Sequence, residues 1–270
     1  MSSDRSWQQG MPEAYDAGLG PAKFTPYARA LAERVAAMRP ATVLELAAGT
    51  GLLTRELVAL LPSASITATD LNPPMVDYGS QQVPEATWSQ ANAQDLPFED
   101  ASFDVVACAF GVMFFDRALA LPEMLRVLRP GGAAVFSVWD AVDALPLTAD
   151  LYEELCRLHP DDPPDFFVRV PYGYHDESVI RAEVLAGGFS DVVVERVPLT
   201  TTAPSAAAIV DGYCYGTPLR FALADRGDLD VSAAHLRAAM AEWYGDGPVP
   251  LVMSALLVSA TGGSRAATPA

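Results

Sequence analysis

Residues 42–54, Thr-Val-Leu-Glu-Leu-Ala-Ala-Gly-Thr-Gly-Leu-Leu-Thr, constrain the fold more than any other part of this 270-residue chain. The apolar run at 43–46 is typical of a buried parallel strand. Gly49 and Gly51 then permit a tight turn and a close approach of the backbone to a ligand, and leucines recur at helical spacing after them. We therefore predict a strand, a glycine turn and a helix, with a ligand bound at the helix N-terminus.

Several interpretations compete for this turn. A phosphate-binding loop of the Walker type needs Gly-Lys-Ser/Thr, and no lysine follows these glycines, so we exclude it. The dinucleotide pattern G-x-G-x-x-G would begin at Gly49 and would need a third glycine where Thr54 stands. Glu45, at the strand end, would also repel a pyrophosphate. A turn that only connects a strand to a helix remains an open alternative.

The pattern E-x-A-x-G-T-G at residues 45–51 resembles motif I of the class I S-adenosylmethionine-dependent methyltransferases. The ligand of that family carries a cationic amino group and a sulfonium, so a nearby acid is favourable. Residues 92–106 closely resemble the D-A-x-x-L-P-F-x-D-x-S-F-D-x-V block of the ubiquinone/menaquinone-type methyltransferases, with Asn92 in place of the first Asp. Leu-Arg-Pro-Gly-Gly at 128–132, before a strand, is a further family feature. The resemblance covers roughly residues 15–140.

The resemblance implies an α/β, Rossmann-like fold: a seven-stranded, mostly parallel sheet with helices on both faces, ending in an antiparallel hairpin. Residues 11–24 show little periodicity, and a helix is expected over 175–189. The predicted parts are an N-terminal lid segment (1–24), a cofactor-binding core (25–140), a cap insertion after strand five (141–174), a continuation of the core (175–202), a cap insertion after strand six (203–247), the last core strand (248–262) and a tail (263–270).

The resemblance also implies S-adenosyl-L-methionine as the cofactor. Asp70, at the end of the second predicted strand, can accept both ribose hydroxyls, although it can also cap the helix that follows. Asn92 would read the adenine amino group through its side-chain carbonyl, and Tyr15 is a candidate lid residue or a packing aromatic. The expected cofactor-binding residues are Tyr15, Glu45, Ala47, Gly49, Gly51, Asp70, Leu71, Met75, Asn92, Ala93, Gln94, Ala109 and Phe110.

The expected acceptor is a small, apolar or aromatic metabolite, a quinone or a secondary metabolite, methylated by in-line displacement. The cap insertions are rich in aromatic side chains, which would line an apolar pocket or simply hold the cap together. The expected pocket residues are Met113, Phe114, Phe167, Tyr172, Tyr174 and Tyr213. His175 is the candidate general base, against helix capping or local hydrogen bonding. The alternative function is a cyclase-like enzyme or binding protein that holds the cofactor without transferring methyl.

The composition of the chain argues against some classes of binding partner. The formal charge of −17 would repel phosphate backbones and anionic membrane surfaces, so we expect neither nucleic acid nor a membrane as a partner. The three cysteines are scattered and apolar-flanked, as reduced core residues are, and no Cys/His spacing resembles a metal site. The N-terminus has no apolar signal core. We therefore expect a cytoplasmic monomer or homodimer that needs no metal.

Overall fold

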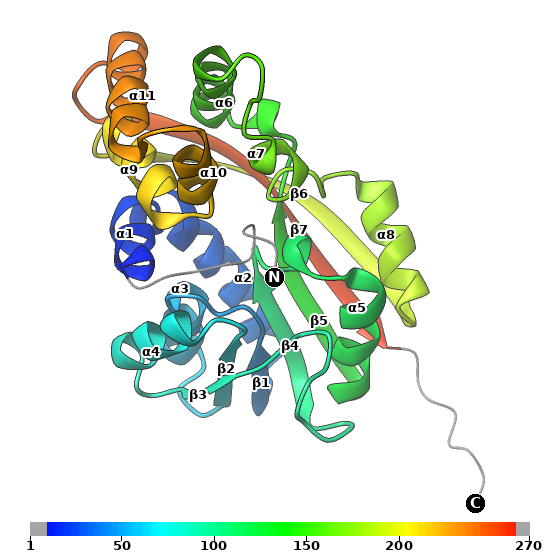
Figure 1. The fold of residues 1–270 in the computed structure, drawn as a ribbon. Coiled ribbons are helices and arrows are strands. Elements are labelled where there is room, and N and C mark those ends of the chain that lie inside the picture. Colours follow the sequence, from blue (N-terminus) through cyan, green and yellow to red (C-terminus); the bar gives the residue numbers. More distant parts are fainter. Residues whose placement is uncertain (1–9, 263–270) are drawn as a thin grey trace, which may run out of the picture.

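The computed structural model describes residues 10–262, apart from the side chain of Phe167. Its centre is a seven-stranded sheet of order β3-β2-β1-β4-β5-β7-β6 (Figure 1). Strands β1 to β5 pair in parallel, whereas β7 is antiparallel to both β5 and β6. The predicted fold class is confirmed, including the antiparallel hairpin at the end of the chain.

The strands lie close to their predicted positions, and β4 has the predicted bounds. The described strands are β1 Thr42–Glu45, β2 Ser65–Asp70, β3 Thr87–Gln90, β4 Phe103–Ala109, β5 Leu128–Trp139, β6 Phe189–Ala203 and β7 Val249–Gly262. β5 begins five residues earlier than the apolar run at 133–138 suggests, because Gly131 adopts φ 83° and lets the Leu-Arg-Pro-Gly-Gly segment join the strand. The long hairpin β6–β7 extends beyond the parallel strands toward the helical cap (Figure 1).

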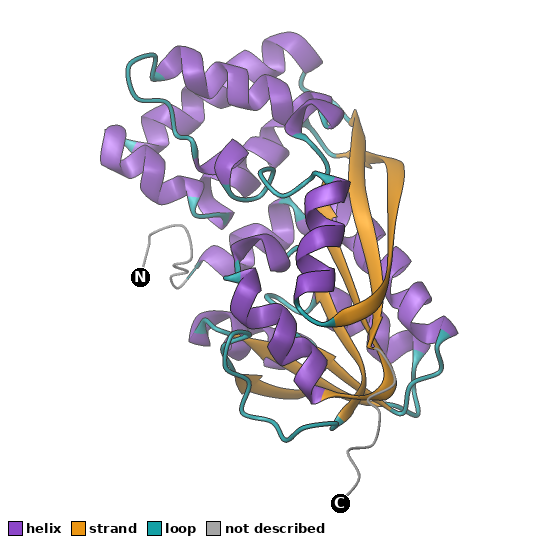
Figure 2. Ribbon diagram, turned by 90° about the vertical axis from the view of Figure 1, so that its right-hand side faces the viewer, coloured by secondary structure: helices purple, strands orange, loops and turns teal. Residues whose placement is uncertain are grey.

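Helices cover both faces of the sheet (Figure 2). Helices α2 and α3 pack against each other, and α5 packs against α8 on the opposite face. The buried side chains of each helix recur at helical spacing, as Leu31 and Val35 do in α2. The bounds of these helices and of α4 are α2 Thr25–Ala37, α3 Leu52–Leu60, α4 Pro73–Gln82, α5 Arg117–Val127 and α8 Glu177–Ala186.

The two insertions form a second, helical layer above the carboxyl ends of the parallel strands (Figure 1). Helices α6 and α7 come from 141–174, and α9, α10 and α11 come from 203–247. α11 packs on α9 and α6, and α10 contacts α7 and α9. The bounds are α6 Pro146–Leu158, α7 Phe166–Arg169, α9 Ala206–Gly216, α10 Leu219–Arg226 and α11 Leu229–Tyr244. We call these five helices, together with the loops of 141–174 and 203–247, the cap.

The N-terminal segment is more regular than the sequence predicts. It forms α1 (Met11–Gly18) and a five-residue π-helix, η2 (Gly20–Phe24), which runs directly into α2. Gly18 lies so close to Gly212 that an added Cβ would come within 2.6 Å of the backbone of that residue, so α1 packs tightly on α9. Residues 1–9 and the predicted tail at 263–270 lie outside the described residues.

The helix predicted over 175–189 is shorter in the structure. Asp176 caps its N-terminus, accepting hydrogen bonds from the backbone N–H groups of Ser178 and Val179. His175 therefore precedes α8, and Phe189 already belongs to β6.

Candidate functional site

A cavity lies between the carboxyl ends of the parallel strands and the cap. Strands β1, β2, β4 and β5 supply its floor, helices α1 and η2 supply one wall, and α7, α9 and the loop before α8 supply the roof. This is where open α/β sheets bind ligands. The cavity is lined by Tyr15, Leu19, Lys23, Phe24, Ala28, Glu45, Ala47, Ala48, Gly49, Thr50, Leu52, Leu53, Thr69, Asp70, Leu71, Asn72, Met75, Ala91, Asn92, Ala93, Gln94, Ala109, Phe110, Gly111, Met113, Phe114, Phe115, Trp139, Phe166, Pro171, Tyr172, Tyr213, Thr217 and Pro218.

Asp70 connects the glycine turn to the tip of β2. Its Oδ2 accepts a hydrogen bond from the backbone N–H of Gly49 at 2.9 Å, and its Oδ1 accepts from the backbone N–H of Asn72 at 2.9 Å. Burial raises the pKa of Asp70, and these hydrogen bonds lower it again in part. The carboxylate retains lone pairs for ligand hydroxyl groups, so it can bind a diol at the cavity wall.

Glu45 is a buried carboxyl group at the end of β1. It is 1% exposed, and its Oε2 has no hydrogen-bond partner among the described residues. Burial raises its pKa to about 8, and the nearby Asp70 carboxylate adds to the effect. A cationic group in the cavity would supply the missing counter-charge, so this end of the cavity fits a ligand with an amino group.

The backbone of the strand tips is arranged to approach a ligand. Ala47 and Phe110 follow β1 and β4 and adopt the left-handed conformation, with φ 50° and 53°. Such residues cluster at functional sites, since the conformation is costly for a side chain with Cβ. Gly49, with φ 57°, has no atom within 4 Å of a Cβ built on it, so the turn leaves open space there. The turn, Asp70 and Glu45 together fit an adenosine with an amino-acid end.

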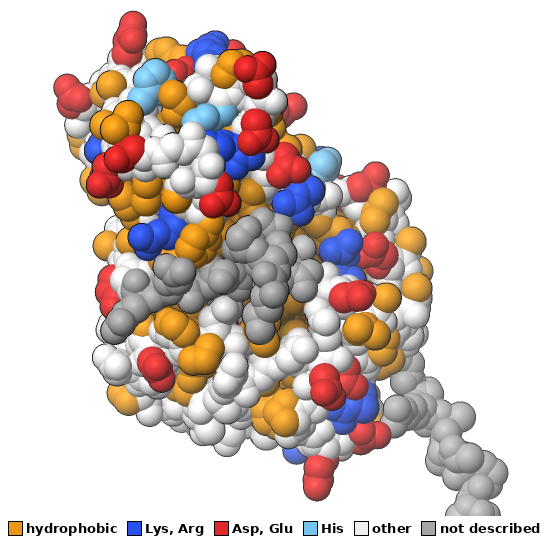
Figure 3. All heavy atoms as spheres, in the orientation of Figure 1, with side chains coloured by type: hydrophobic (Ala, Val, Ile, Leu, Met, Phe, Trp, Pro, Cys, Tyr) orange, Lys and Arg blue, Asp and Glu red, His pale blue; other side chains and the backbone are white. Residues whose placement is uncertain are grey.

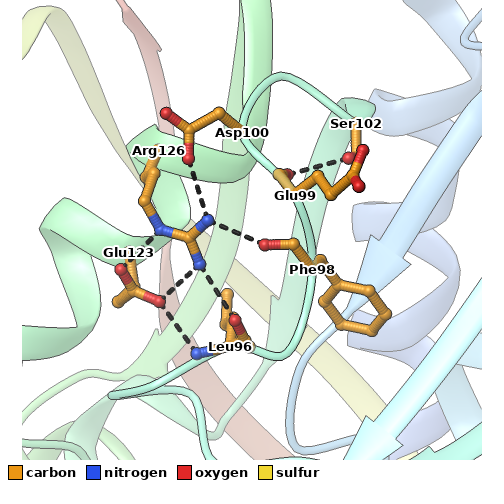
Figure 4. A network of polar contacts seen from close by, with 7 residues as sticks. All are labelled: Leu96, Phe98, Glu99, Asp100, Ser102, Glu123 and Arg126. Atoms are coloured by element: carbon orange, nitrogen blue, oxygen red, sulfur yellow. Dashed lines mark hydrogen bonds and ion pairs between the residues drawn. The ribbon is translucent and has the colours of Figure 1, made fainter.

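The family-like loop before β4 is held by one arginine of α5 (Figure 4). Arg126 donates to the carbonyl oxygens of Leu96 and Phe98 at 2.9 and 2.7 Å, and it pairs with Asp100 and Glu123. Glu123 in turn accepts the backbone N–H of Leu96 at 2.8 Å. The network fixes the loop that follows Asn92, Ala93 and Gln94 at the cavity. Much of the family-like sequence pattern at 92–106 therefore stabilises the loop rather than contacting a ligand.

The other end of the cavity is aromatic. Phe110 stacks on Trp139 with ring centroids 3.9 Å apart, and Phe24 packs edge-on against both rings at 5.4 and 5.5 Å. Trp139 lies at the end of β5 and is 2% exposed. Stacked and edge-on pairs of this kind are favourable beyond their burial, so the floor is a rigid apolar surface.

Two tyrosines of the cap face this floor. The hydroxyl groups of Tyr172 and Tyr213 lie 2.7 Å apart, and that of Tyr213 is 3.3 Å from the Thr148 hydroxyl. Burial raises the pKa of Tyr213 to about 12 and raises the pKa of Tyr172 well above its usual value. Both remain protonated at neutral pH. Because one of their two protons lies in the hydrogen bond between them, one of the two hydroxyl groups can donate to a bound ligand.

Lys23 lies between the aromatic floor and these tyrosines. Its side chain is 1% exposed, and its Nζ is 3.9 Å from the centroid of Trp139 and 5.8 Å from those of Tyr172 and Tyr213. Nζ has no hydrogen-bond partner among the described residues. Burial lowers its pKa to about 7. The sequence analysis missed this residue.

The cavity brings together most of the predicted site residues. All the predicted cofactor-binding residues line it except Gly51, which begins α3 with φ 86° and packs against Trp88 and Val83. The predicted pocket residues that line it are Met113, Phe114, Tyr172 and Tyr213.

Three predicted pocket or catalytic residues are not placed at the cavity. Tyr174 is buried outside it, with the guanidinium of Arg117 4.1 Å from its ring centroid, and the side chain of Phe167 is not described. His175 also does not line the cavity. Its Nδ1 lies 2.7 Å from the carbonyl oxygen of Tyr172, which is the local hydrogen bonding considered as the alternative to a base.

The N-terminal segment is bonded to the glycine turn through Asp16. The hydroxyl groups of Thr50 and Tyr78 donate to its carboxylate at 3.2 and 3.3 Å. Tyr15 packs against Phe24 with centroids 4.8 Å apart, and both line the cavity. The segment therefore forms a wall of the cavity that is held by its packing on α9 and by the polar bonds of Asp16.

We predict that hydrogen exchange of residues 11–24 slows when S-adenosylhomocysteine is added, because a ligand in the cavity adds contacts to Tyr15 and its neighbours. The Asp16→Ala variant, without the two bonds to Thr50 and Tyr78, should exchange faster in this segment before ligand is added. Exchange mass spectrometry of both proteins checks this. An unchanged rate in the wild type would show that the segment does not respond to the ligand.

Charges on the face shown in Figure 3 are interspersed, with acidic and basic side chains on both the cap and the sheet domain. Within residues 10–262, no helix is long and apolar enough to cross a membrane. The same residues contain no group of three His, Cys, Asp or Glu side chains that could hold a metal ion. That no metal is needed stays a prediction.

Comparisons with known proteins agree with the fold. A family model described as a methyltransferase domain matches residues 44–136. The ubiquinone/menaquinone biosynthesis C-methyltransferase UbiE of Hahella chejuensis is 44% identical over 100 residues, which are 34% of this chain and 40% of the relative. The chain thus matches less than half the length of that relative. The methyltransferase tpcH of Aspergillus fumigatus is 29% identical over 242 residues, 82% of this chain and 84% of the relative.

Solved structures show the same fold. Phosphoethanolamine N-methyltransferase 2 of Haemonchus contortus, in complex with phosphomonomethylethanolamine and S-adenosylhomocysteine, superimposes with a TM-score of 0.61 at 15% identity. The match covers 96% of this chain and 59% of that one. The domain match and the relatives show that the chain contains a class I S-adenosylmethionine-dependent methyltransferase domain at residues 44–136.

Proposed function

We propose that this protein transfers a methyl group from S-adenosyl-L-methionine to a small, largely apolar or aromatic metabolite, such as a quinone-like compound. One observation carries the proposal. A single cavity joins a polar end, made by Glu45, Gly49 and Asp70, to an aromatic end, made by Trp139 and the cap. A cofactor and an acceptor can therefore lie side by side in one enclosed space.

The polar end of the cavity contains a side chain that could bind each part of the cofactor. Asp70 would accept the ribose hydroxyls, and Glu45 would balance the positive charge of the amino-acid end. Asn92 would accept a hydrogen bond from the adenine amino group, since its Oδ1 has a second lone pair beside the one that accepts the backbone N–H of Gln94 at 3.1 Å. Leu71 and Met75, which line the same region, would pack against the adenine ring.

The aromatic end suits an apolar acceptor. Phe114 of η3 (Val112–Phe114) and Phe166 of α7 lie with ring centroids 6.5 Å apart on either side of the cavity. Burying apolar surface contributes roughly 25 cal/mol per Å², which can hold a compact ligand without ionic contacts. One relative is named as a C-methyltransferase of ubiquinone and menaquinone biosynthesis, and quinones are ring compounds of this kind.

The chemistry demands little from the protein besides alignment. The cofactor supplies an activated methyl group on a sulfonium. The strand tips and the cap would hold the acceptor in line with that methyl and exclude water from between them. Phe110, which lines the cavity and stacks on Trp139, would contact the acceptor from below.

Asp70→Ala should weaken the binding of S-adenosylhomocysteine by at least about 1 kcal/mol, because hydrogen bonds to a charged acceptor are lost. Isothermal titration calorimetry measures the change. Asp77→Ala, which removes an exposed carboxylate in α4, serves as the matched control and should bind normally. Equal affinity in all three proteins would remove Asp70 from the cofactor site.

A transfer assay separates the proposal from binding without transfer. Labelled S-adenosylmethionine offered with a panel of phenols, quinols and other apolar metabolites should yield a labelled product. Binding of cofactor with no product across the panel would favour the alternative, a cyclase-like enzyme or binding protein.

The proposal includes a reducing, cytoplasmic location and a monomer or homodimer. All three cysteines, Cys108, Cys156 and Cys214, are free.

A further inference from the structure

Lys23 is the only lysine in the sequence. A lysine usually keeps its ammonium group in water, yet this side chain is 1% exposed and reaches the cavity from within η2. Such π-helical segments occur frequently at functional sites. The buried residues of η2 include Ala22 and Lys23, so the π-helix turns the lysine inward, toward the aromatic end.

The surroundings of Lys23 lack a counter-charge. Nζ makes no hydrogen bond to a described residue, and burial lowers its pKa to about 7. The two buried acids of the cavity, Glu45 and Asp70, each have a pKa raised by burial, with no contribution from Lys23. Around the amine lie the Trp139 ring and the hydroxyl-bearing rings of Tyr172 and Tyr213. A neutral amine in such a place is a base.

The free-energy cost of burying the Lys23 amine without a partner indicates that the amine binds a ligand. Burying an amine without a partner destabilises a fold, and an apolar side chain of similar length would pack there without that cost. The position of Nζ favours the acceptor over the cofactor, since Trp139 ends β5 and the two tyrosines belong to the cap. An acceptor group at this point would meet the amine and two tyrosine hydroxyls together.

We propose that Lys23 is a catalytic base of this enzyme, which removes the proton from an acidic hydroxyl group, a phenol or an enol, on the methyl acceptor. The inference rests on the proposed function and names the acceptor class for it. The O–H bond of the acceptor breaks, its electron pair stays on oxygen, and the proton forms a new N–H bond at Nζ. The resulting ammonium lies over Trp139 in a cation–π contact. The hydroxyl group of Tyr172 or Tyr213 whose proton is not used in the bond between them can donate to the oxyanion.

The test uses 2-naphthol as the probe and its methyl ether, 2-methoxynaphthalene, as the matched ligand without an acidic proton. At pH 8.5 free naphthol is largely protonated in water, and Lys23 is largely neutral. On binding to the wild type, naphthol should acquire the absorbance of naphtholate, because the oxyanion supplies the counter-charge that the buried ammonium lacks and so raises the proton affinity of the amine. Protein labelled with ¹³Cε-lysine gives a single lysine signal, which should move to the ammonium position at the same time. The ether should produce neither change.

Lys23→Met should lose the naphtholate absorbance and bind naphthol and the ether alike. S-adenosylhomocysteine should bind this variant as it binds the wild type, which shows that the fold and the cofactor site are intact. The proposal is overturned if bound naphthol stays protonated in the wild type, if naphthol does not bind, or if naphtholate forms equally in the variant. A variant that loses affinity for S-adenosylhomocysteine instead would assign Lys23 to the cofactor, which also overturns it.

These outcomes separate the inference from the proposed function. Failure of the wild type to bind S-adenosylhomocysteine contradicts the methyltransferase proposal, whatever naphthol does. Normal binding of S-adenosylhomocysteine with protonated naphthol contradicts only the role of Lys23.

Discussion

Lys23→Met is expected to make the folded protein more stable, by up to about 5 kcal/mol at pH 6. Burial lowers the pKa of the amine from 10.5 to about 7, and each tenfold change in proton affinity corresponds to about 1.36 kcal/mol. The wild type therefore carries the full cost of a buried ammonium below pH 7. Methionine fills similar space without a charge. A side chain that is kept for function at a cost to stability should make the protein more stable when it is replaced.

The direction in which the stability difference changes with pH follows from the lowered pKa of Lys23. Between about pH 7 and 10.5 the unfolded chain holds a proton on Lys23 that the folded chain lacks, so the stability of the wild type rises with pH. The advantage of the methionine variant is thus greatest below pH 7 and shrinks as the pH approaches 10.5. Other titrating groups are shared by both proteins and cancel in the difference.

Urea unfolding of both proteins at pH 6, 8 and 10 measures this effect. Arg29→Met is a suitable control, because Arg29 is exposed and its pairing with Glu33 is on the surface. That change should shift stability by less than about 1 kcal/mol, with little dependence on pH. A Lys23→Met variant less stable than the wild type at pH 6 would mean that the amine has a stabilising partner in the folded protein.

The cofactor end of the site could be predicted from the sequence because it is built from local patterns. A strand, a glycine turn and a helix occupy consecutive residues, and parallel strands place Glu45 and Asp70 at the same edge of the sheet. Gly51 shows the limit of the same reasoning. It belongs to the motif, but its φ of 86° serves the start of α3, and its neighbour is Trp88 rather than the cavity.

The acceptor end could not be predicted in the same way, because distant segments form it. Lys23 stands between Ala22 and Phe24 in a stretch without helical periodicity, where a lysine normally indicates a solvated surface. The π-helix that turns it inward has no clear sequence pattern, and its neighbours in space lie 116 residues or more along the chain. One signal was available: it is the sole lysine in a chain whose other basic residues are arginines.

His175 illustrates a different error. Its position next to the first insertion suggested a base, and no pattern of neighbouring residues supported that role. In the structure, Nδ1 of His175 donates a hydrogen bond to the carbonyl oxygen of Tyr172. The histidine therefore fixes the loop that carries a tyrosine of the cavity. A residue close in sequence to a site can thus position the site without contacting a ligand.

The affinity for S-adenosylhomocysteine is expected to fall about tenfold for each pH unit below 8, reaching about 100-fold at pH 6. Burial raises the pKa of Glu45 to about 8 in the free protein. The cationic amino group of the ligand would favour the ionised carboxylate, so binding at lower pH must first release a proton. Above pH 8 the carboxylate is already ionised, and the affinity should level off.

Calorimetry at pH 6, 7 and 8 tests this, and comparing buffers of different ionisation enthalpy at pH 7 detects the released proton directly. Glu45→Gln should remove the pH dependence and should bind more weakly than the wild type at pH 8, because the attraction to the amino group is lost. Glu85→Gln, which changes an exposed carboxyl group, should retain the full dependence. Buried Asp70 also has a raised pKa, so a slope that survives in Glu45→Gln would assign the released proton to Asp70. A wild-type affinity that does not vary between pH 6 and 8 would mean that neither buried acid meets the positive charge of the ligand.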